Sequence, residues 1–390
     1  MKIYEVGGAV RDRLLDRPVS DRDWVVVGGS PEEMLALGYR QVGRDFPVFL
    51  HPETHEEYAL ARLERKQGQG YRGFAFDTSP HVTLEEDLAR RDVTINAMAR
   101  DDGGRIIDPY GGQKDLAAGV LRHITPAFAE DPLRVLRVAR FAARFGFSIA
   151  PETLTLMQQL ARGGELLTLS PERVWRELER ALMEAHPSRF LQVLRDCGAL
   201  APLLPEIDRQ FGQPRCPGDQ PPGDAGEHLL GSLMLAAKAD LGLQVCFVLL
   251  ALIPSDCASG MEQAIRQAEE LCHRLRAPVT LTETALALVR EQIAVRGACT
   301  LEVEELVALL ERLDGFRRAD RFEDVLCACA VDARAPVLGD YAPAVRLRLA
   351  LAACRSAKPD AEALASKDGA RIKAALHAAR VAAMAHAEAG

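Results

Sequence analysis

Two aspartates separated by a single residue, Asp21 and Asp23, lie near the N-terminus in the segment Asp21-Arg22-Asp23-Trp24. In an extended strand, residues i and i+2 point to the same side, so both carboxylates would face one point. A hard divalent cation with oxygen ligands, chiefly Mg²⁺, suits such a pair and cancels its repulsion. Two such ions can activate an attacking hydroxyl and neutralise a leaving phosphate. The pair therefore predicts a magnesium site with catalytic aspartates.

A glycine pair, Gly7-Gly8, precedes these acids and is followed by a helical pattern. Backbone N–H groups at such a turn suit a triphosphate, and Arg11 can add a charged fork to it. Each motif alone is common on surfaces that bind nothing, but together at this spacing they favour a nucleotide and metal site. Glu57, with Glu56 pointing the other way, is a candidate third carboxylate. A surface strand with two exposed acids explains Glu57 equally well.

An arginine-rich segment follows, in the blocks RRDVTINA (residues 90–97) and EDPLRVLRVAR (residues 130–140). Four arginines are spaced by 3, 3 and 4 residues and share one helical face with Asp131; they are Arg134, Arg137, Arg140 and Arg144. The opposite face is expected to carry Val135, Leu136, Val138 and Phe141. Guanidinium groups aligned in this way repel one another unless anions lie among them, and a polyphosphate or an RNA backbone would supply these. A solvated face is the alternative, although such a face normally mixes both signs of charge.

Asp131 and Arg134 suggest how a base is selected. Cytosine and adenine both present an exocyclic amine beside a ring-nitrogen acceptor, so a carboxylate and an arginine can bind either base. Uracil and guanine reverse this order and would leave buried polar groups unpaired. One protein pair would thus accept C and A and exclude U and G without a template.

The elements that must position these residues change along the chain. The first part alternates strand and helix signals: strands at residues 2–6, 23–27, 46–51 and 57–62, and helices at 9–15 and 31–37. The Gly- and Gln-rich stretch 66–72 predicts a loop. Helical periodicity dominates afterwards, and a Pro- and Gly-rich stretch marks a linker. The fold class is α+β, with a head at 1–112, a helical neck at 113–211, a linker at 212–227 and an all-α body and tail at 228–390.

Composition excludes several classes of protein. The chain has 390 residues, 48% hydrophobic and 27% charged, with a formal net charge of −8, as in a globular protein of several domains without a general basic coat. Nine cysteines without a CxxC pair favour reduced thiols over a disulfide framework or a zinc site. The N-terminus has no secretory signal, and the most apolar stretch, 241–254, is too short for a bilayer. We expect a cytoplasmic protein without a membrane partner.

These blocks resemble the bacterial tRNA nucleotidyltransferases (CCA-adding enzymes) of the second class, within the polymerase-β-like nucleotidyltransferase superfamily. The resemblance is close over residues 1–210 and loose beyond them. Besides the two arginine-rich blocks, it rests on MKIYEVGGAVRDRLLDRPVSDRDWVVVG, VGRDFPVFLHPETHEEYALAR and DPYGGQKDL. It implies a polymerase-β-like head with a small mixed sheet, and addition of C, C and A to the 3′ end of tRNA from CTP and ATP.

The resemblance also assigns roles to residues. Asp21 and Asp23 would bind Mg²⁺, and Asp131 and Arg134 would read the base. Asn96 would lie near the sugar. The nucleoside triphosphate would be held by Gly8, Arg11, Arg91, Arg137 and Arg140.

The second half departs from the family pattern. Close relatives carry an HD-type phosphohydrolase domain there, with a His-Asp dipeptide and further histidines. His228 is present, but Leu252 and Ile253 stand where His-Asp is expected. Because neither side chain can bind a metal, we expect a degenerate remnant that contacts tRNA and has no phosphohydrolase activity. Metal-dependent hydrolysis of 2′,3′-cyclic nucleotides would contradict this.

Two rival interpretations have different tests. A bacterial poly(A) polymerase shares the head and neck motifs, but it typically has extra residues before the glycine motif and a basic tail. Here Gly7-Gly8 nearly begins the sequence and the last residues are Ala-rich. Such an enzyme would not add C. A non-catalytic RNA-binding protein is the second rival, and an Asp23→Ala protein as active as the wild type would favour it.

Overall fold

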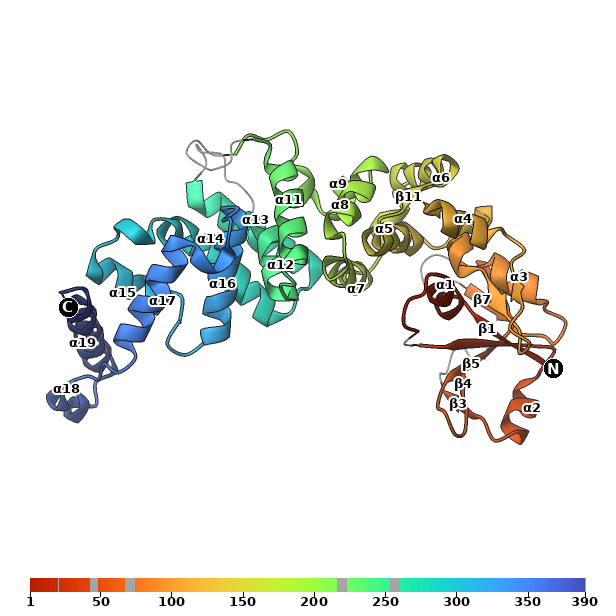
Figure 1. Ribbon diagram of the computed structural model, residues 1–390, viewed down its shortest axis with the longest axis horizontal. Helices are drawn as coiled ribbons and strands as arrows, with labels where there is room; N and C mark the ends of the chain where they lie inside the picture. Colours follow the sequence, from red (N-terminus) through yellow and green to blue (C-terminus); the bar gives the residue numbers. More distant parts are fainter. Residues whose placement is uncertain (20, 43–47, 67–73, 216–222, 253–259, 390) are drawn as a thin grey trace. The chain divides into compact units, whose positions relative to one another are not determined.

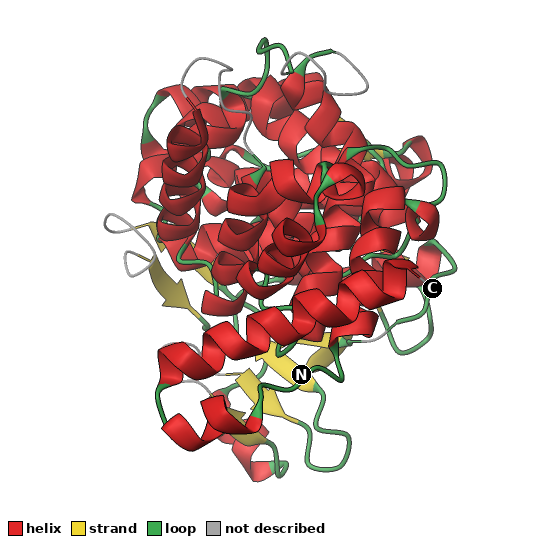
Figure 2. Ribbon diagram, turned by 90° about the vertical axis from the view of Figure 1, so that its left-hand side faces the viewer, coloured by secondary structure: helices red, strands yellow, loops and turns green. Residues whose placement is uncertain are grey.

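The computed structural model describes residues 1–19, 21–42, 48–66, 74–215, 223–252 and 260–389 (Figure 1). The chain divides into two compact units, Met1–Leu203 and Leu204–Gly390. All strands of the described ranges belong to the first unit, and helices make up most of the remainder (Figure 2). The α+β class and the small mixed N-terminal sheet are therefore confirmed.

The first unit is built on a seven-stranded mixed sheet with the order β3-β4-β5-β2-β1-β8-β9. At its centre β2 pairs antiparallel with β1 and parallel with β5. The strands are β1 (Lys2–Val6), β2 (Asp23–Val27), β3 (Arg40–Val42), β4 (Val48–Leu50), β5 (Glu57–Leu60), β8 (Ala99–Arg100) and β9 (Ile106–Ile107). The two central strands have the predicted bounds, since both are rich in β-branched residues.

The short strands were harder to predict. β3, β8, β9 and a separate hairpin of β6 (Leu63–Lys66) and β7 (Phe74–Asp77) were not expected. The strand predicted at 46–51 is seen as β4, and its first two residues lie outside the described residues. Most of the loop predicted at 66–72 also lies outside them. These strands are two to four residues long, so pairing with neighbours rather than a sequence pattern defines them.

Hydrophobic residues of β2 point to both faces of the sheet because side chains alternate along a strand. On one face Val25 packs with Leu88 of helix α3 (Leu84–Ala89). On the other face Val26 packs with Met34 of helix α2 (Pro31–Ala36). Both helices begin with a capping box, Ser30 with Glu33 and Thr83 with Glu86. Each face of the central strand is thus covered, and β2 is fixed in place.

The neck follows with α4 (Gly112–Ala118), α5 (Leu133–Phe145), α6 (Pro151–Arg162), α7 (Pro171–Leu182), α8 (Pro187–Asp196) and α9 (Leu200–Leu203). α5 is its central helix and packs on α7 and α8. The prediction of an all-helical neck was wrong in one detail: β10 (Val120–Leu121) and β11 (Ser148–Ile149) form a parallel pair. Two residues per strand leave no periodicity to detect.

The second unit is helical throughout its described part. Its elements are α10 (Pro205–Asp208), α11 (Ala225–Lys238), α12 (Leu243–Ala251), α13 (Gly260–Leu275), α14 (Val279–Arg296), α15 (Val303–Arg312), α16 (Ala319–Asp332), α17 (Ala342–Cys354), α18 (Ala361–Ser366) and α19 (Gly369–Ala389). The described cysteines are free thiols, as expected. Within the ranges given above, no helix is long and apolar enough to cross a membrane.

The division between units precedes the predicted linker at 212–227. α10 packs on α13, and Glu206 of α10 accepts a hydrogen bond from Arg274 Nη2 of α13 at 2.9 Å. The end of the predicted linker is already helical, because Asp224 caps α11 by accepting from the Glu227 backbone N–H. Proline and glycine content therefore marked a stretch that follows the boundary rather than the boundary itself.

Candidate active site

The two acids near the N-terminus lie at the start of β2. Asp23 is its first residue, whereas Asp21 lies in the loop before it. Asp23 is in register with Glu57 of the adjacent parallel strand, so these two side chains share a face of the sheet. Glu56 points the other way, as predicted, and accepts a hydrogen bond from Trp24 Nε1 at 3.1 Å. Within the described ranges no three His, Cys, Asp or Glu side chains cluster closely enough to hold a metal ion.

The carboxyl of Asp23 lies among opposing influences. Although the residue is partly exposed, desolvation by the surrounding protein raises its pKa, Arg91 lowers it, and the nearby Asp21 raises it further. The net shift is upward, because desolvation, with a smaller contribution from Asp21, outweighs the attraction of Arg91. A bound cation would counteract this shift. Oxygen ligands from two carboxylates are a donor set that fits Mg²⁺.

The glycine turn fixes Arg91 next to Asp23. Gly7 has φ of 71°, and a Cβ at this residue would lie 2.8 Å from Arg91 Nη1. Only glycine allows the guanidinium to cross the turn so closely. Arg91 Nη2 donates to Asp87, but its Nε is buried without a hydrogen-bond partner in the described structure. A buried donor left unsatisfied by protein atoms is what a site for an anionic ligand would show.

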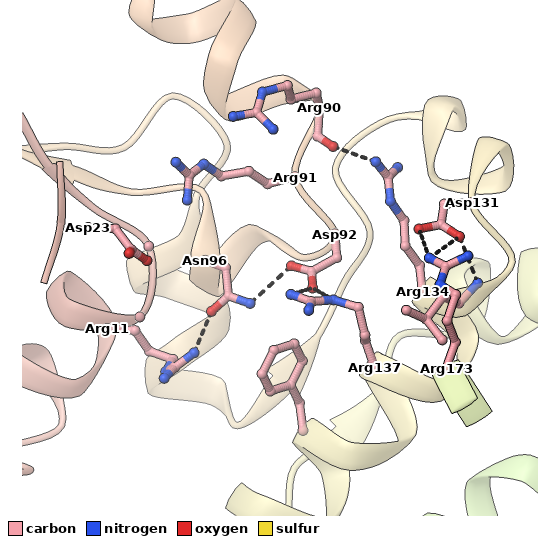
Figure 3. A pocket seen from close by; sticks show the side chains of 14 residues that line it. Arg11, Asp23, Arg90, Arg91, Asp92, Asn96, Asp131, Arg134, Arg137 and Arg173 are labelled. Carbon is pink, nitrogen blue, oxygen red and sulfur yellow. Dashed lines mark hydrogen bonds and ion pairs between the residues drawn. The ribbon is translucent and has the colours of Figure 1, made fainter. Parts of the chain in front are cut away.

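A chain of hydrogen bonds links the helix after the glycines to the neck (Figure 3). Arg11 Nη1 donates to Asn96 Oδ1 at 2.5 Å, Asn96 Nδ2 donates to Asp92 Oδ1 at 3.0 Å, and Arg137 Nε donates to Asp92 Oδ2 at 2.7 Å. Burial alone would raise the pKa of Asp92, but Arg137, Asn96 and the Val93 backbone N–H together lower it to about 2. Asp92 is thus an ionised anchor that orients an arginine and an amide towards the same space.

Asp131 and Arg134 lie together on the neck side of that space. Arg173 Nη2 donates to both carboxylate oxygens of Asp131, at 3.1 and 3.0 Å. The guanidinium of Arg134 is held by two backbone carbonyls, each at 2.7 Å: Ala127 O and Arg90 O. Figure 3 shows the bond to Arg90 O. One acceptor and one donor group are therefore held by other protein groups in the lining of the same pocket.

The predicted arginine face has different partners from those expected. The acids that balance it come from the protein: Asp92 for Arg137, Glu177 for Arg140 and Asp12 for Arg144. The argument that external anions must lie among these arginines was therefore wrong, because tertiary contacts bring the acids in. Arg140 is buried and bound to Glu177 at 2.6 Å, away from the pocket.

Phe141 was also placed on the wrong face of α5. It follows Arg137 by four residues and so lies on the same side. Arg140 lies over its ring at 4.6 Å from the centroid, and Arg11 and Arg137 lie at 5.7 Å. An aromatic face among guanidiniums holds them by cation–π attraction and leaves an apolar wall in the pocket.

These groups surround one open pocket of about 480 Å³. It is lined by Gly7, Gly8, Arg11, Asp23, Arg90, Arg91, Asp92, Asn96, Asp131, Leu133, Arg134, Arg137, Phe141 and Arg173. Six arginines against three aspartates give the lining a positive excess that suits a polyphosphate. Every predicted nucleotide-binding residue except Arg140 lines it, together with Asp23 but not Asp21.

Sequence reasoning did not assign four polar or aromatic lining residues to the site: Arg90, Asp92, Phe141 and Arg173. The first two stand inside the recognised block RRDVTINA, and the spacing from Arg137 could have found Phe141. Arg173 carried no signal, because its partner Asp131 is 42 residues away in the chain.

A second charged cluster lies in the other unit, around the retained His228. His228 Nε2 lies 3.1 Å from Asp332 Oδ1, and Arg296 Nη2 lies 2.6 Å from Asp332 Oδ2. Burial would raise the pKa of Asp332, but its hydrogen bond with His228 and the charges of Arg296 and Arg215 lower it. Leu252 is the C-cap residue that follows α12, while Ile253 lies outside the described residues.

Comparisons with known proteins cover both units. Residues 3–122 match a family described as the poly A polymerase head domain, and residues 146–211 match one described as a probable RNA and SrmB-binding site of polymerase A. The multifunctional CCA protein of Azoarcus sp. (strain BH72) is 52% identical over 98% of this chain and 97% of its own length. That of Burkholderia multivorans is 50% identical over 99% of each chain.

Solved structures share the fold at low identity. The Bacillus stearothermophilus CCA-adding enzyme in complex with CTP matches with a TM-score of 0.64 and 24% identity, over 99% of this chain and 89% of that one. A CCA-adding enzyme with ATP matches with a TM-score of 0.67 and 22% identity, over 98% and 86%.

Proposed function

The chain belongs to the family of multifunctional CCA proteins, and from this premise we propose that it adds C, C and A to the 3′ end of tRNA. It would use CTP and ATP without a nucleic-acid template and release pyrophosphate. Two solved structures of similar fold are CCA-adding enzymes in complex with CTP and with ATP. The observation that carries the proposal is the arginine-rich pocket, which has a carboxylate at one side and a fixed acceptor–donor pair at the other.

Different pocket residues would bind different parts of the nucleotide. Arg91 and Arg11 face the side of Asp23 and suit the triphosphate, and the unsatisfied Nε of Arg91 supports this assignment. Asn96 and Arg137, both tied to Asp92, would hold the middle of the nucleotide, and Asn96 would lie near the sugar. Phe141 offers an apolar wall. Arg140 would act indirectly, because its ion pair with Glu177 holds α7 in place.

The reaction is an in-line attack of the tRNA 3′-hydroxyl on the α-phosphorus. A bond forms between the hydroxyl oxygen and that phosphorus, the bond to the β-phosphate oxygen breaks, the hydroxyl proton is released, and pyrophosphate leaves. Asp21 and Asp23 would hold Mg²⁺, and this ion would supply a lower pKa for the hydroxyl and screening of charge on the phosphate oxygens. Glu57, on the same face of the sheet as Asp23, remains a candidate third ligand. The pocket arginines neutralise the triphosphate and keep it aligned.

Asp131 and Arg134 would select the base. Asp131 accepts from the exocyclic amine of cytosine or adenine, and Arg134 donates to the adjacent ring nitrogen. Arg173 holds the carboxylate of Asp131 (Figure 3), and two backbone carbonyls hold Arg134. Because both groups are held by protein, they cannot rearrange cheaply to fit uracil or guanine.

One assay tests the function. Purified protein is incubated with Mg²⁺ and tRNA that ends before CCA, with each nucleoside triphosphate alone and with CTP and ATP together, and the product ends are sequenced. We expect C to be added from CTP alone and a complete CCA end from the two together. UTP and GTP should give no product. Long A tails from ATP alone would instead identify a poly(A) polymerase, and absence of any addition would contradict catalysis.

A further inference from the structure

Helix α7 carries three arginines, Arg173, Arg176 and Arg180, at spacings of three and four residues. This spacing places them on one side of the helix. The other side is buried and includes Val174, Trp175, Leu178, Ala181 and Leu182. Arg173 lines the nucleotide pocket, whereas Arg176 and Arg180 are exposed. The row therefore begins at the pocket and continues along the helix for about 10 Å, at 1.5 Å per residue.

The two outer arginines are not neutralised. Within the part of the chain that the structure describes, neither Arg176 nor Arg180 has an ion pair or a hydrogen bond from its side chain. Acids that could pair with Arg180 at helical spacing are present, since Glu177 precedes it by three residues and Glu184 follows by four. Both are turned towards Arg140, at 2.6 and 3.8 Å.

Their state contrasts with that of four other arginines of α5 and α7. Arg137, Arg140, Arg144 and Arg173 each have a carboxylate partner. Two adjacent unpaired guanidiniums are therefore a local exception in a protein whose net charge is −8. A polyanion approaching the pocket would find this strip the favourable place to lie.

We propose that Arg176 and Arg180 bind the phosphodiester backbone of the RNA strand whose 3′-hydroxyl enters the pocket, with Arg173 at the junction between strand and nucleotide. This rests on the proposed function and names the residues of its RNA contact. α7 lies inside the segment matched to a family described as a probable RNA-binding site. Guanidinium groups bind phosphate oxygens through paired N–H donors and carry no base preference, so the contact suits many tRNA sequences.

The test is the double variant R176Q/R180Q. Glutamine keeps a long side chain and a good helix propensity, so α7 should stay folded. The affinity for a tRNA that ends before CCA is measured by fluorescence anisotropy at several KCl concentrations. We expect Kd to rise about tenfold and the slope of log Kd against log salt to fall by about 1.4, the value for two phosphates on a single strand. The KM for RNA should rise, while kcat and the KM for CTP should not.

Two further proteins make the result decisive. R40Q/R105Q removes the same charge from two exposed arginines of the head and should leave Kd and the salt slope unchanged. R176K/R180K should restore most of the binding, because lysine also binds phosphate. Unchanged RNA affinity in R176Q/R180Q, or a rise in the KM for CTP alone, would overturn the proposal. Binding needs no turnover, so a wild type that binds RNA in this way but adds no nucleotide would contradict only the proposed function.

Discussion

Two buried aspartates, one in each unit, accept arginine hydrogen bonds but serve different ends. Asp92 holds Arg137 and Asn96, and all three line the pocket in the first unit. Asp332 in the second unit accepts hydrogen bonds from His228, Arg215 and Arg296, so the members of this cluster bind one another. A buried ion pair is part of a binding site only when its members still face a cavity. Otherwise it joins helices, as Asp332 joins α11, α14 and α16.

The balance of charge in the two clusters makes the same distinction. The pocket has more arginines than acids and contains an unsatisfied donor, Arg91 Nε. Around Asp332 the carboxylate oxygens are already shared among three cationic or hydrogen-bonding side chains, so little capacity for a ligand is left. The first cluster is therefore expected to govern activity, and the second to govern stability.

The largest effect is expected from Asp23→Asn. Loss of one negative ligand should lower kcat for C addition by at least about 10³-fold, because charge at the phosphate is no longer screened. Tm and tRNA affinity should stay close to those of the wild type. Single-turnover incorporation of labelled CMP measures the rate. Glu53→Gln, which alters an exposed acid in the same unit, is the matched control. Near-normal activity of Asp23→Asn would contradict the expectation that the pocket governs activity while the cluster around Asp332 governs stability.

Asp332→Asn should act on stability instead. It leaves Arg215 and Arg296 beside a neutral amide, which should cost about 3 kcal/mol of unfolding free energy. Urea denaturation measures this, with the exposed Asp320→Asn on the same helix as the control. In the folded protein, kcat for C addition should change by less than about twofold, since Asp332 belongs to the second unit and does not line the pocket. Loss of kcat with unchanged stability would give the second cluster a catalytic role.

Asp131→Ala should relax base selection. Without the carboxylate, the ratio of kcat/KM for CTP over UTP should fall by about 10²-fold, because the amine of cytosine loses its acceptor. Competition between CTP and UTP on one tRNA measures this ratio. Glu130→Ala alters the neighbouring acid, which does not line the pocket, and should preserve it. Unchanged exclusion of UTP and GTP would refute the assigned role of Asp131.

The smallest effect concerns acid stability. The pKa of Asp92 is lowered from 3.8 to about 2 in the folded protein, which corresponds to about 2 kcal/mol of stability. A depressed pKa contributes stability that is present above pH 4 and is lost as the pH falls towards 2. The difference in unfolding free energy between the wild type and Asp92→Asn should therefore shrink over this window. A difference that is constant with pH would show that Asp92 does not carry the ionised bond to Arg137.

The sequence predicts which residues form the site better than it predicts their ion-pair partners. Spacing alone identified β1, β2 and the glycine turn, and the arginine spacing predicted one face of α5, because these are local properties. It could not identify the partner of Arg140, since Glu177 lies 37 residues away and only the packing of α7 on α5 brings it near. For the same reason Arg173 was missed. The loss of phosphohydrolase activity remains a prediction, supported by the absence of metal ligands at Leu252 and Ile253.

The hydrogen atom in place of a side chain at Gly7 has a consequence for variation at this residue. A methyl group there would meet Arg91 Nη1 and would also force a left-handed backbone on alanine. Gly7→Ala would thus displace the guanidinium of Arg91 and strain the backbone of the turn. A second substitution that relieved the contact with Arg91 would not relieve the backbone strain. Two separate obstacles therefore oppose substitution of Gly7, and a change in either Arg91 or the turn must be compatible with the other.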